Sequence, residues 1–220
     1  LEIAQYLRTP VTSGNTYTAA LAIQGLAKAA DILGYHLSEC QVAVIGATGD
    51  IGSICTKILV KQAKVVVLAA RNEKRLTEFA SEIEHGASAT IRVIKYTAEA
   101  VKNADLVLTA TSAVTTLIEP KDLKSGAVVC DVAYPANIHR DVIRYRPDVL
   151  VFEGGLATWP LYDRLQQKEK LQHFAPPGTI HGCLAETILL ALEGKFENFS
   201  IGRGRITEER IHEITKLAHK

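Results

Sequence analysis

A glycine-rich turn between two apolar segments is the first feature of this sequence that could do chemistry. The turn reads Gly46-Ala47-Thr48-Gly49-Asp50-Ile51-Gly52 and follows the β-branched run at 41–45. A helix that starts in such a turn directs its backbone N–H groups and the positive end of its dipole at a phosphate, and glycines let the phosphate approach. Because a predicted strand precedes the turn and a predicted helix follows it, we expect the turn to hold a dinucleotide's pyrophosphate rather than to be purely structural.

The end of the second predicted strand indicates which dinucleotide binds. NAD sites usually carry an Asp or Glu there, about 20 residues after the turn, to bond the ribose hydroxyls. This sequence has Ala70-Arg71-Asn72 instead, with Lys74 and Arg75 close behind. A guanidinium binds a 2′-phosphate with two hydrogen bonds, whereas a carboxylate repels it. The sequence therefore predicts NADP, held by Arg71, Asn72 and Arg75. The alternative for Arg71 is a solvated residue at a helix start.

Two further segments are candidates for the nicotinamide end of the cofactor. Ala110, Thr111 and Ser112 end the fourth predicted strand, while Ala133 and Tyr134 follow the fifth. The carboxyl ends of parallel strands line the ligand crevice in folds of this kind. Ordinary loop chemistry explains these five residues about equally well.

Cys183 is the candidate nucleophile. It follows the break Pro176-Pro177-Gly178 and lies in the first turn of a predicted helix, where the helix dipole stabilises a thiolate. His181, two residues earlier, could accept the thiol proton or donate one later. A thiolate near a hydride donor suits attack on an acyl thioester, formation of an acyl-enzyme and reduction to an aldehyde. The alternative is a small core residue, which is how we interpret the other three cysteines.

Other chemistries are excluded by what the sequence lacks. None of the seven tyrosines is followed four residues later by Lys, the pair that short-chain dehydrogenases with similar glycines need. His181 and Cys183 are too few to bind zinc, and no Ser–His–Asp signature is present. The net charge of +1 gives no broad electrostatic basis for binding nucleic acid or an anionic membrane. No apolar run reaches the roughly 18–20 residues that span a bilayer. Four widely spaced cysteines without a CxxC pair indicate a reducing, cytoplasmic setting.

The elements that must position these residues alternate along the chain. We expect strands at 41–45, 64–69, 90–94, 106–110, 127–132 and 149–152, and helices at 16–33, 50–62, 72–84, 98–103, 180–192 and 207–218. Apolar strands that alternate with helices form a parallel sheet covered on both faces. The expected fold is α/β, a Rossmann-type doubly wound parallel sheet with an N-terminal helix and a C-terminal helical extension. We expect residues 1–220 to form one NADP-binding domain, with its core at 39–155 and flanking helices at 16–34 and 179–220.

Five motifs together resemble one family. They are Val11–Ala19, the glycine turn, Ala70–Asn72, Gly182–Glu186 and Asn198–Arg203. Jointly, and over nearly all of the chain, they resemble the cyanobacterial long-chain fatty acyl-[acyl-carrier-protein] reductases. The resemblance implies NADPH-dependent reduction of an acyl thioester, with acyl carrier protein as a candidate carrier, to a fatty aldehyde. It matches Cys183 to the family's acyl-accepting cysteine, and it matches the glycine turn and Arg71 to the family's NADPH site.

The sequence departs from that family in three respects. Tyr17 replaces a usual histidine, Asp131–Tyr134 stands where the family favours glycines, and the family's further N-terminal domain, which receives the acyl chain, is expected to be absent here. For Thr12–Thr18 the resemblance leaves a choice between the nicotinamide and the substrate. Acyl chain length, carrier and oligomeric state, a homo-oligomer included, stay open. The alternatives are another NADP-dependent oxidoreductase, related to shikimate dehydrogenase or glutamyl-tRNA reductase, and a non-catalytic nucleotide-binding module.

Overall fold

The computed structural model describes residues 2–160, 175–202 and 204–220. The chain divides into two compact units, one formed by Ala22–Gly154 and the other by Leu1–Leu21 with Gly155–Lys220. We call the first the sheet unit and the second the terminal unit. Helix α1 (Asn15–Ile32) begins in the terminal unit and ends in the sheet unit. Arg203, the last residue of the fifth motif, lies outside the described residues.

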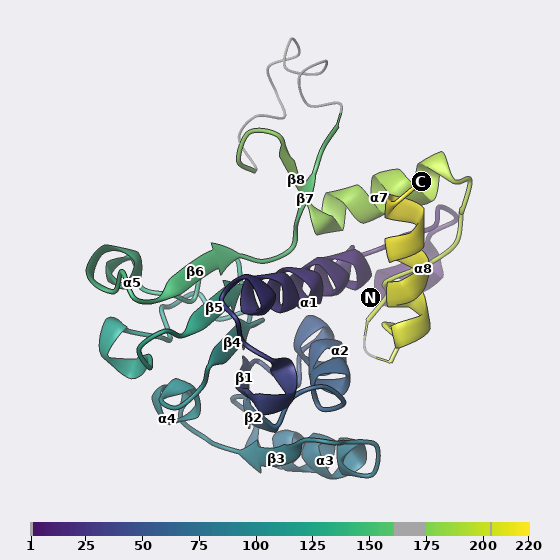
Figure 1. Ribbon diagram of the computed structural model, residues 1–220. Coiled ribbons are helices and arrows are strands. Elements are labelled where there is room, and N and C mark those ends of the chain that lie inside the picture. Colours follow the sequence, from purple (N-terminus) through teal and green to yellow (C-terminus); the bar gives the residue numbers. More distant parts are fainter. Residues whose placement is uncertain (1, 161–174, 203) are drawn as a thin grey trace. The chain divides into compact units, whose positions relative to one another are not determined.

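The sheet unit contains a six-stranded parallel sheet of order β3-β2-β1-β4-β5-β6 (Figure 1). Ile45 at the end of β1 pairs with Ala69 on β2 and Thr109 on β4, so three carboxyl ends lie at the same level. The strand order reverses between β1 and β4, which is the point at which Rossmann-type sheets bind their ligands. The predicted doubly wound α/β fold is confirmed. The strands are β1 (Gln41–Ile45), β2 (Val65–Ala69), β3 (Thr90–Val93), β4 (Leu106–Thr109), β5 (Val128–Asp131) and β6 (Leu150–Glu153).

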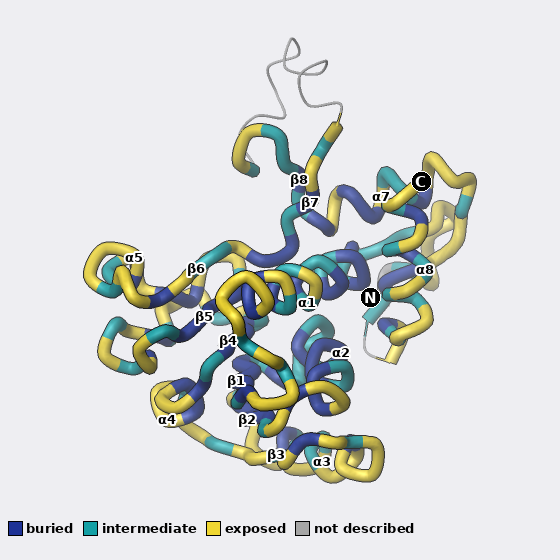
Figure 2. The backbone as a smooth tube through the Cα atoms, viewed as in Figure 1, coloured by how far each residue is buried: buried dark blue, intermediate teal, exposed yellow. Residues whose placement is uncertain are grey.

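Helices cover both faces of this sheet. On one face, Ala43, Val107 and Val129 pack with Ala100 and Val142 in a single buried cluster. The alternate residues of the same strands are equally buried, as a doubly covered sheet requires, and the central strands are dark blue in Figure 2. The edge strand β3 is mostly exposed. The helices of this unit are the later part of α1, η2 (Leu37–Glu39), α2 (Asp50–Leu59), α3 (Glu73–Glu84), α4 (Thr97–Val101), η3 (Pro120–Asp122) and α5 (Arg140–Tyr145).

The end of α1 shows why its predicted boundary was close to the observed one. Gly34 has a φ of +76°, and the N–H of Tyr35 donates to the carbonyl of Ala30 at 2.9 Å. This is the left-handed glycine termination that helices commonly use. On its inner side, Gly25 packs against the ring of Phe152 on β6, because a Cβ there would lie only 3.0 Å from that ring. A small residue therefore sets how closely α1 approaches the sheet.

The terminal unit carries the predicted helical extension. Its elements are η1 (Glu2–Tyr6), the start of α1, β7 (Leu156–Thr158), β8 (Thr179–His181), α7 (Gly182–Leu192) and α8 (Glu208–Ala218). Phe199 and Ile214 are fully buried at its core, together with Tyr17, Ala185 and Leu190. The side chain of Thr207 accepts a hydrogen bond from the N–H of Arg210 and caps α8.

The sequence-based assignment differs from the structure around β7 and β8 and at α5 (Arg140–Tyr145). The predicted helix at 180–192 begins only at Gly182, because residues 179–181 form β8, an antiparallel partner of β7. Neither short strand was predicted, since three residues are too few to show a period of two. The short helix α5 was also missed. Among the residues that the structure describes, no helix is long and apolar enough to cross a lipid bilayer.

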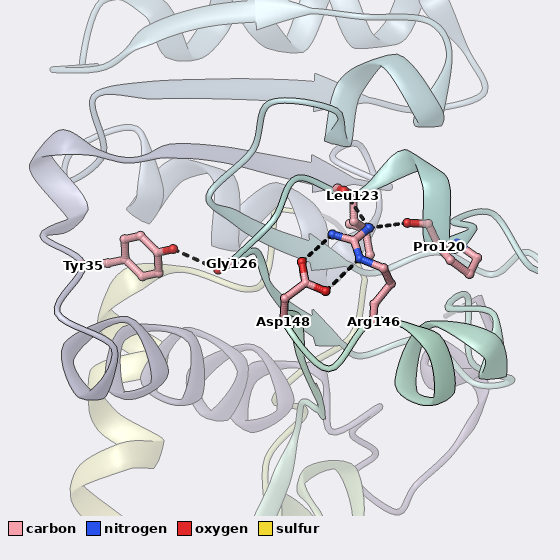
Figure 3. A network of polar contacts seen from close by, with 6 residues as sticks. All are labelled: Tyr35, Pro120, Leu123, Gly126, Arg146 and Asp148. Atoms are coloured by element: carbon pink, nitrogen blue, oxygen red, sulfur yellow. Dashed lines mark hydrogen bonds and ion pairs between the residues drawn. The ribbon is translucent and has the colours of Figure 1, made fainter.

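An arginine holds together the loops that precede β5 and β6 (Figure 3). Arg146 donates to both carboxylate oxygens of Asp148, at 2.9 and 2.8 Å, and to the carbonyls of Pro120 and Leu123, at 2.5 and 2.9 Å. The hydrogen bond from Arg146 holds the pKa of Asp148 well below its usual range. Nearby, the hydroxyl of Tyr35 donates to the carbonyl of Gly126 at 2.9 Å. These contacts fix two connections at the end of the sheet opposite the glycine turn.

Replacing this arginine tests the network. We expect Arg146→Met to lower the thermal unfolding midpoint by about 2–6 °C, since one side chain supplies four hydrogen bonds. Because folding lowers the pKa of Asp148, its carboxylate stabilises the fold at pH values above its unfolded pKa of 3.8, and this stabilisation is lost as the pH falls through the folded pKa. The difference in midpoint between the variant and the wild type should therefore shrink in acid. Arg140→Met, at the exposed start of α5, is the matched control. Equal midpoints for the two variants at neutral pH would contradict the assignment.

Candidate functional site

The glycine turn joins β1 to α2, and its backbone passes too close to neighbouring backbone for larger residues. Gly46 has a φ of +85°, and a Cβ on it would lie 2.4 Å from the carbonyl oxygen of Ala110. A Cβ on Gly52 would lie 2.2 Å from the carbonyl oxygen of Gly46. Both neighbours are backbone atoms, which cannot rotate away. The result is a tight cradle at the carboxyl end of β1, in contact with the end of β4.

The hydrogen bonds of the turn narrow the candidates for phosphate contact. The N–H groups of Gly46 and Ala47 both donate to the carbonyl of Ala69, at 2.8 and 3.2 Å. Gly49 caps α2 and has no side chain that could accept from the first-turn N–H groups, which lack acceptors within a helix. The N–H of Gly49 is engaged as well, because it donates to the carbonyl of Gly46 at 2.9 Å. Of the predicted turn residues, Thr48 and Ile51 are therefore better placed to meet a phosphate than Gly46, Ala47 and Gly49.

The three polar residues at the end of β2 have different roles. Arg75 donates from Nη2 to the carbonyl of Thr48 at 3.0 Å, so it braces the glycine turn. The side chain of Asn72 caps α3 by accepting from the N–H of Arg75 at 3.0 Å. Arg71 is exposed just before that cap. The structure thus brings Arg75 to the turn and leaves Arg71 as the exposed arginine of the predicted set.

A buried carboxylate at the end of β5 organises the segment that contains Ala133 and Tyr134. Asp131 is 6% exposed, and it accepts hydrogen bonds from the N–H groups of Ala133 at 3.0 Å and Asn137 at 2.8 Å. It also accepts from the hydroxyl of Thr109 on β4. Tyr134, at 91% exposed, projects from this segment. One acidic side chain therefore shapes the loop after β5.

Asn137 extends this arrangement to the loop after β4. Its side-chain oxygen accepts from the hydroxyl of Thr111 at 2.7 Å, and its side-chain nitrogen donates to the carbonyl of Ala113 at 3.2 Å. The two predicted nicotinamide segments are thus joined, with Ala110 lying against Gly46 and Ser112 exposed. Sequence analysis did not select Asn137 as a site residue, because its partners lie 24 and 26 residues away.

The cysteines separate by burial. Cys40, Cys55 and Cys130 are buried, whereas Cys183 is exposed. Burial raises the pKa of Cys55 to about 12 and also raises the pKa values of Cys40 and Cys130. The interpretation of these three as core residues is confirmed. At neutral pH, Cys183 is therefore the cysteine best suited to react.

Cys183 is the second residue of α7, directly after the N-cap His181 and Gly182. The N–H of Gly182 donates to the carbonyl of Gly155 at 2.7 Å. Gly14, from the Val11–Ala19 motif, packs on the cysteine backbone, because a Cβ on Gly14 would lie 2.1 Å from the Cα of Cys183. Two motifs far apart in sequence thus meet within the terminal unit. The predicted cofactor residues all belong to the sheet unit.

The family relationship of the sheet unit is clear from comparison with known proteins. Residues 27–152 match the family described as shikimate / quinate 5-dehydrogenase. One of the dipicolinate synthase polypeptides of Bacillus halodurans has a solved structure similar to this one, with a TM-score of 0.52 and 15% identity, over 64% of this chain and 48% of that one. At that identity, the likeness indicates a shared fold only.

Two curated relatives extend over nearly the whole chain. A long-chain acyl-[acyl-carrier-protein] reductase of Synechococcus elongatus is 32% identical over 206 residues, which are 92% of this chain and 58% of that protein. The aminotransferase PigE of a Serratia species is 31% identical over 212 residues, which are 96% of this chain and 24% of that protein. The resemblance to the long-chain acyl-[acyl-carrier-protein] reductases is therefore confirmed, although the chain spans little more than half the length of that relative.

The cradle can be tested with a pair of glycine variants. Gly52→Ala should destabilise the protein by about 1–3 kcal/mol or more, because its methyl group would overlap the carbonyl of Gly46. Gly86→Ala is the matched control, since a Cβ there meets no heavy atom within 4 Å, and it should be neutral or slightly stabilising. Chemical denaturation of both variants measures the difference. If Gly52→Ala were as stable as Gly86→Ala, the cradle would not be as tight as described.

Proposed function

The chain belongs to the shikimate / quinate 5-dehydrogenase family over residues 27–152, and from that premise we propose that it is an NADP-dependent oxidoreductase that reduces an acyl thioester to an aldehyde. The reaction proceeds through an acyl-enzyme on Cys183. The observation that carries this proposal is that Cys183 is exposed in the first turn of α7, whereas the other three cysteines are buried. The 32% identity to a long-chain acyl-[acyl-carrier-protein] reductase supports the substrate class.

The residues of the sheet unit fit NADP(H). The tight turn of Gly46 and Gly52 lets α2 begin directly at the end of β1, and the backbone of Thr48 and Ile51 at this helix start would hold the pyrophosphate. Arg71 would bind the 2′-phosphate, with Asn72 and Arg75 supporting it from the start of α3. Ala110, Thr111 and Ser112, with Ala133 and Tyr134, would flank the nicotinamide. When bound, NADPH supplies the hydride that reduces the acyl group.

Cys183 supplies the covalent chemistry. Its thiolate attacks the thioester carbonyl, a new carbon–sulfur bond forms, and the carrier's thiolate leaves. His181 at the N-cap of α7 accepts the thiol proton and returns it to the departing sulfur. Reduction of the acyl-enzyme then breaks the bond to Cys183 and releases the aldehyde. The dipole at the start of α7 favours both the attacking thiolate and the thiolate released at the end.

The proposal extends to partners and setting. The acyl group reaches the enzyme as a thioester, with acyl carrier protein as the proposed carrier. A cytoplasmic location agrees with a cysteine composition in which no CxxC pair occurs.

Covalent labelling tests the acyl-enzyme. Incubation with a radiolabelled acyl thioester without NADPH should label the wild-type protein at one site, and Cys183→Ser should abolish the label. Iodoacetamide followed by intact-mass measurement is the control for accessibility, and one modified cysteine per chain is expected at neutral pH because the others are buried. A wild-type protein that binds NADPH but takes up no acyl label would instead favour a non-catalytic nucleotide-binding module.

Cofactor choice is tested at the end of β2. We expect Arg71→Ala to raise the Kd for NADPH about 10- to 100-fold, because charge-assisted hydrogen bonds to the 2′-phosphate are lost, and to leave the Kd for NADH nearly unchanged. Lys74→Ala, an exposed cation three residues further on, is the control and should change the NADPH value less than threefold or so. Fluorescence titration measures all four affinities. Equal losses for both dinucleotides in Arg71→Ala would exclude the 2′-phosphate assignment.

A further inference from the structure

Glu186 is a fully buried carboxylate one helical turn after Cys183. It lies in α7, with an exposed fraction of 0%, among apolar neighbours in sequence such as Ala185 and Ile188. A buried carboxylate is retained only where hydrogen bonds replace its lost water. Neither the fold of the sheet unit nor the chemistry proposed for Cys183 uses this group.

Both oxygens of Glu186 accept hydrogen bonds from distant parts of the chain. Oε1 accepts from the hydroxyl of Ser200 at 2.7 Å and from the hydroxyl of Thr12. Oε2 accepts from the N–H of Tyr17 at 2.7 Å, in the first turn of α1. All three partners donate, so the carboxylate acts only as an acceptor. A glutamine in its place would have only one acceptor oxygen. Its NH2 group would then face groups that donate hydrogen bonds to Glu186 in the wild-type protein.

The loop held by Glu186 is tied together from within as well. Ser13 donates to the carbonyl of Ser200 from its N–H at 2.9 Å and from its hydroxyl at 2.6 Å. The N–H groups of Ser200 and Gly14 donate to the hydroxyl oxygen of Thr12, at 3.1 and 3.2 Å. Thr12 is therefore shared between the carboxylate and two backbone groups. Removing the carboxylate would leave the hydroxyl of Thr12 without the group to which it donates.

The same loop lies directly on the nucleophile. Gly14 is in the left-handed region, with a φ of +73°, and the position of its missing Cβ is 2.1 Å from the Cα of Cys183 and 2.4 Å from its carbonyl oxygen. The hydroxyl of Thr18 donates back to the carbonyl of Gly14 at 2.9 Å. A small shift of residues 12–14 would therefore move a backbone segment that touches Cys183. All of these residues belong to the terminal unit.

We propose that Glu186 is a positioning residue for acyl transfer to Cys183, and that the Thr12–Gly14 loop it holds forms a wall of the thioester site. This inference rests on the proposed function. Glu186 does not touch the substrate. It fixes the position of the Thr12–Gly14 loop, which does touch the substrate. An apolar side chain could pack against this loop but could not fix its position, because that requires the three directed hydrogen bonds to the carboxylate.

Two rates on the same thiol separate positioning from folding. The first is acylation of Cys183 by hexadecanoyl-coenzyme A without NADPH, and the second is alkylation by iodoacetamide, a small reagent that needs no wall. Glu186→Gln should slow acylation about 10- to 100-fold, since displacements near 1 Å cost this much in oriented reactions, and should change alkylation less than about threefold. Glu193→Gln, an exposed glutamate at the C-cap of the same helix, is the matched control and should change neither rate.

A second variant keeps the test decisive if Glu186→Gln folds poorly. Thr12→Val removes one hydroxyl and keeps the side-chain shape, so it should slow acylation in the same direction with a smaller loss. Its effect should be less than additive with that of Glu186→Gln, because both act on one network. Circular dichroism of each variant reports the folded fraction, by which both rates are corrected.

The outcomes are distinct. Loss of acylation with alkylation retained supports the positioning role. Acylation within threefold of wild type in both variants, or equal loss of both rates, overturns it while the acyl-enzyme stands. A wild-type protein that is alkylated at Cys183 but not acylated overturns the proposed function itself, and this inference with it.

Discussion

The carbonyl oxygen of Gly46 lies where a side chain on Gly52 would have to be. This backbone contact closes the turn between β1 and α2 and lets α2 start directly at the carboxyl end of a central strand. The parallel register that aligns Ile45 with Ala69 and Thr109 brings the ends of β2 and β4 to the same edge. Every candidate cofactor residue lies at that edge, as does Gly46, whose left-handed backbone conformation favours glycine.

Each of the two units contains a buried carboxylate that accepts hydrogen bonds from a neighbouring loop and fixes its conformation. Asp131 accepts from backbone N–H groups and a threonine hydroxyl to shape the loop after β5. Glu186 accepts from two hydroxyls and a backbone N–H to hold a loop against Cys183. Burying such groups is costly, and their hydrogen bonds offset rather than exceed that cost. The directed hydrogen bonds to Asp131 and Glu186 instead fix the conformation of each loop, because an acceptor that binds several donors allows only one arrangement of the loop around it.

Burial also sets Cys183 apart from the other three cysteines. Desolvation disfavours the thiolate in Cys40, Cys55 and Cys130, whose pKa values are raised, while Cys183 meets solvent at a helix start. Each of the four cysteines lies outside any CxxC pair, yet burial makes the thiolate unfavourable at three of them and leaves Cys183 in contact with solvent. Only the surroundings of each sulfur distinguish them.

The sequence by itself determined the alternating strands and helices of the sheet unit and its glycine turn. Strands β1 and β2 and helix α3 are local patterns, read from the spacing of apolar residues. Their agreement with the structure has a simple cause, since each depends on neighbours within a few residues.

Tertiary structure decided what the local patterns could not carry. The strands β7 and β8 are three residues each and exist through pairing with one another. Arg75 proved to brace Thr48 across 27 residues, and Glu186 to hold Thr12 across 174. A glutamate in an apolar helix gives little indication of its donors, because these come from segments that only folding brings beside it. The candidate cofactor residues and Cys183 were therefore visible in the sequence, while the contacts of Arg75 and Glu186 were set by long-range folding.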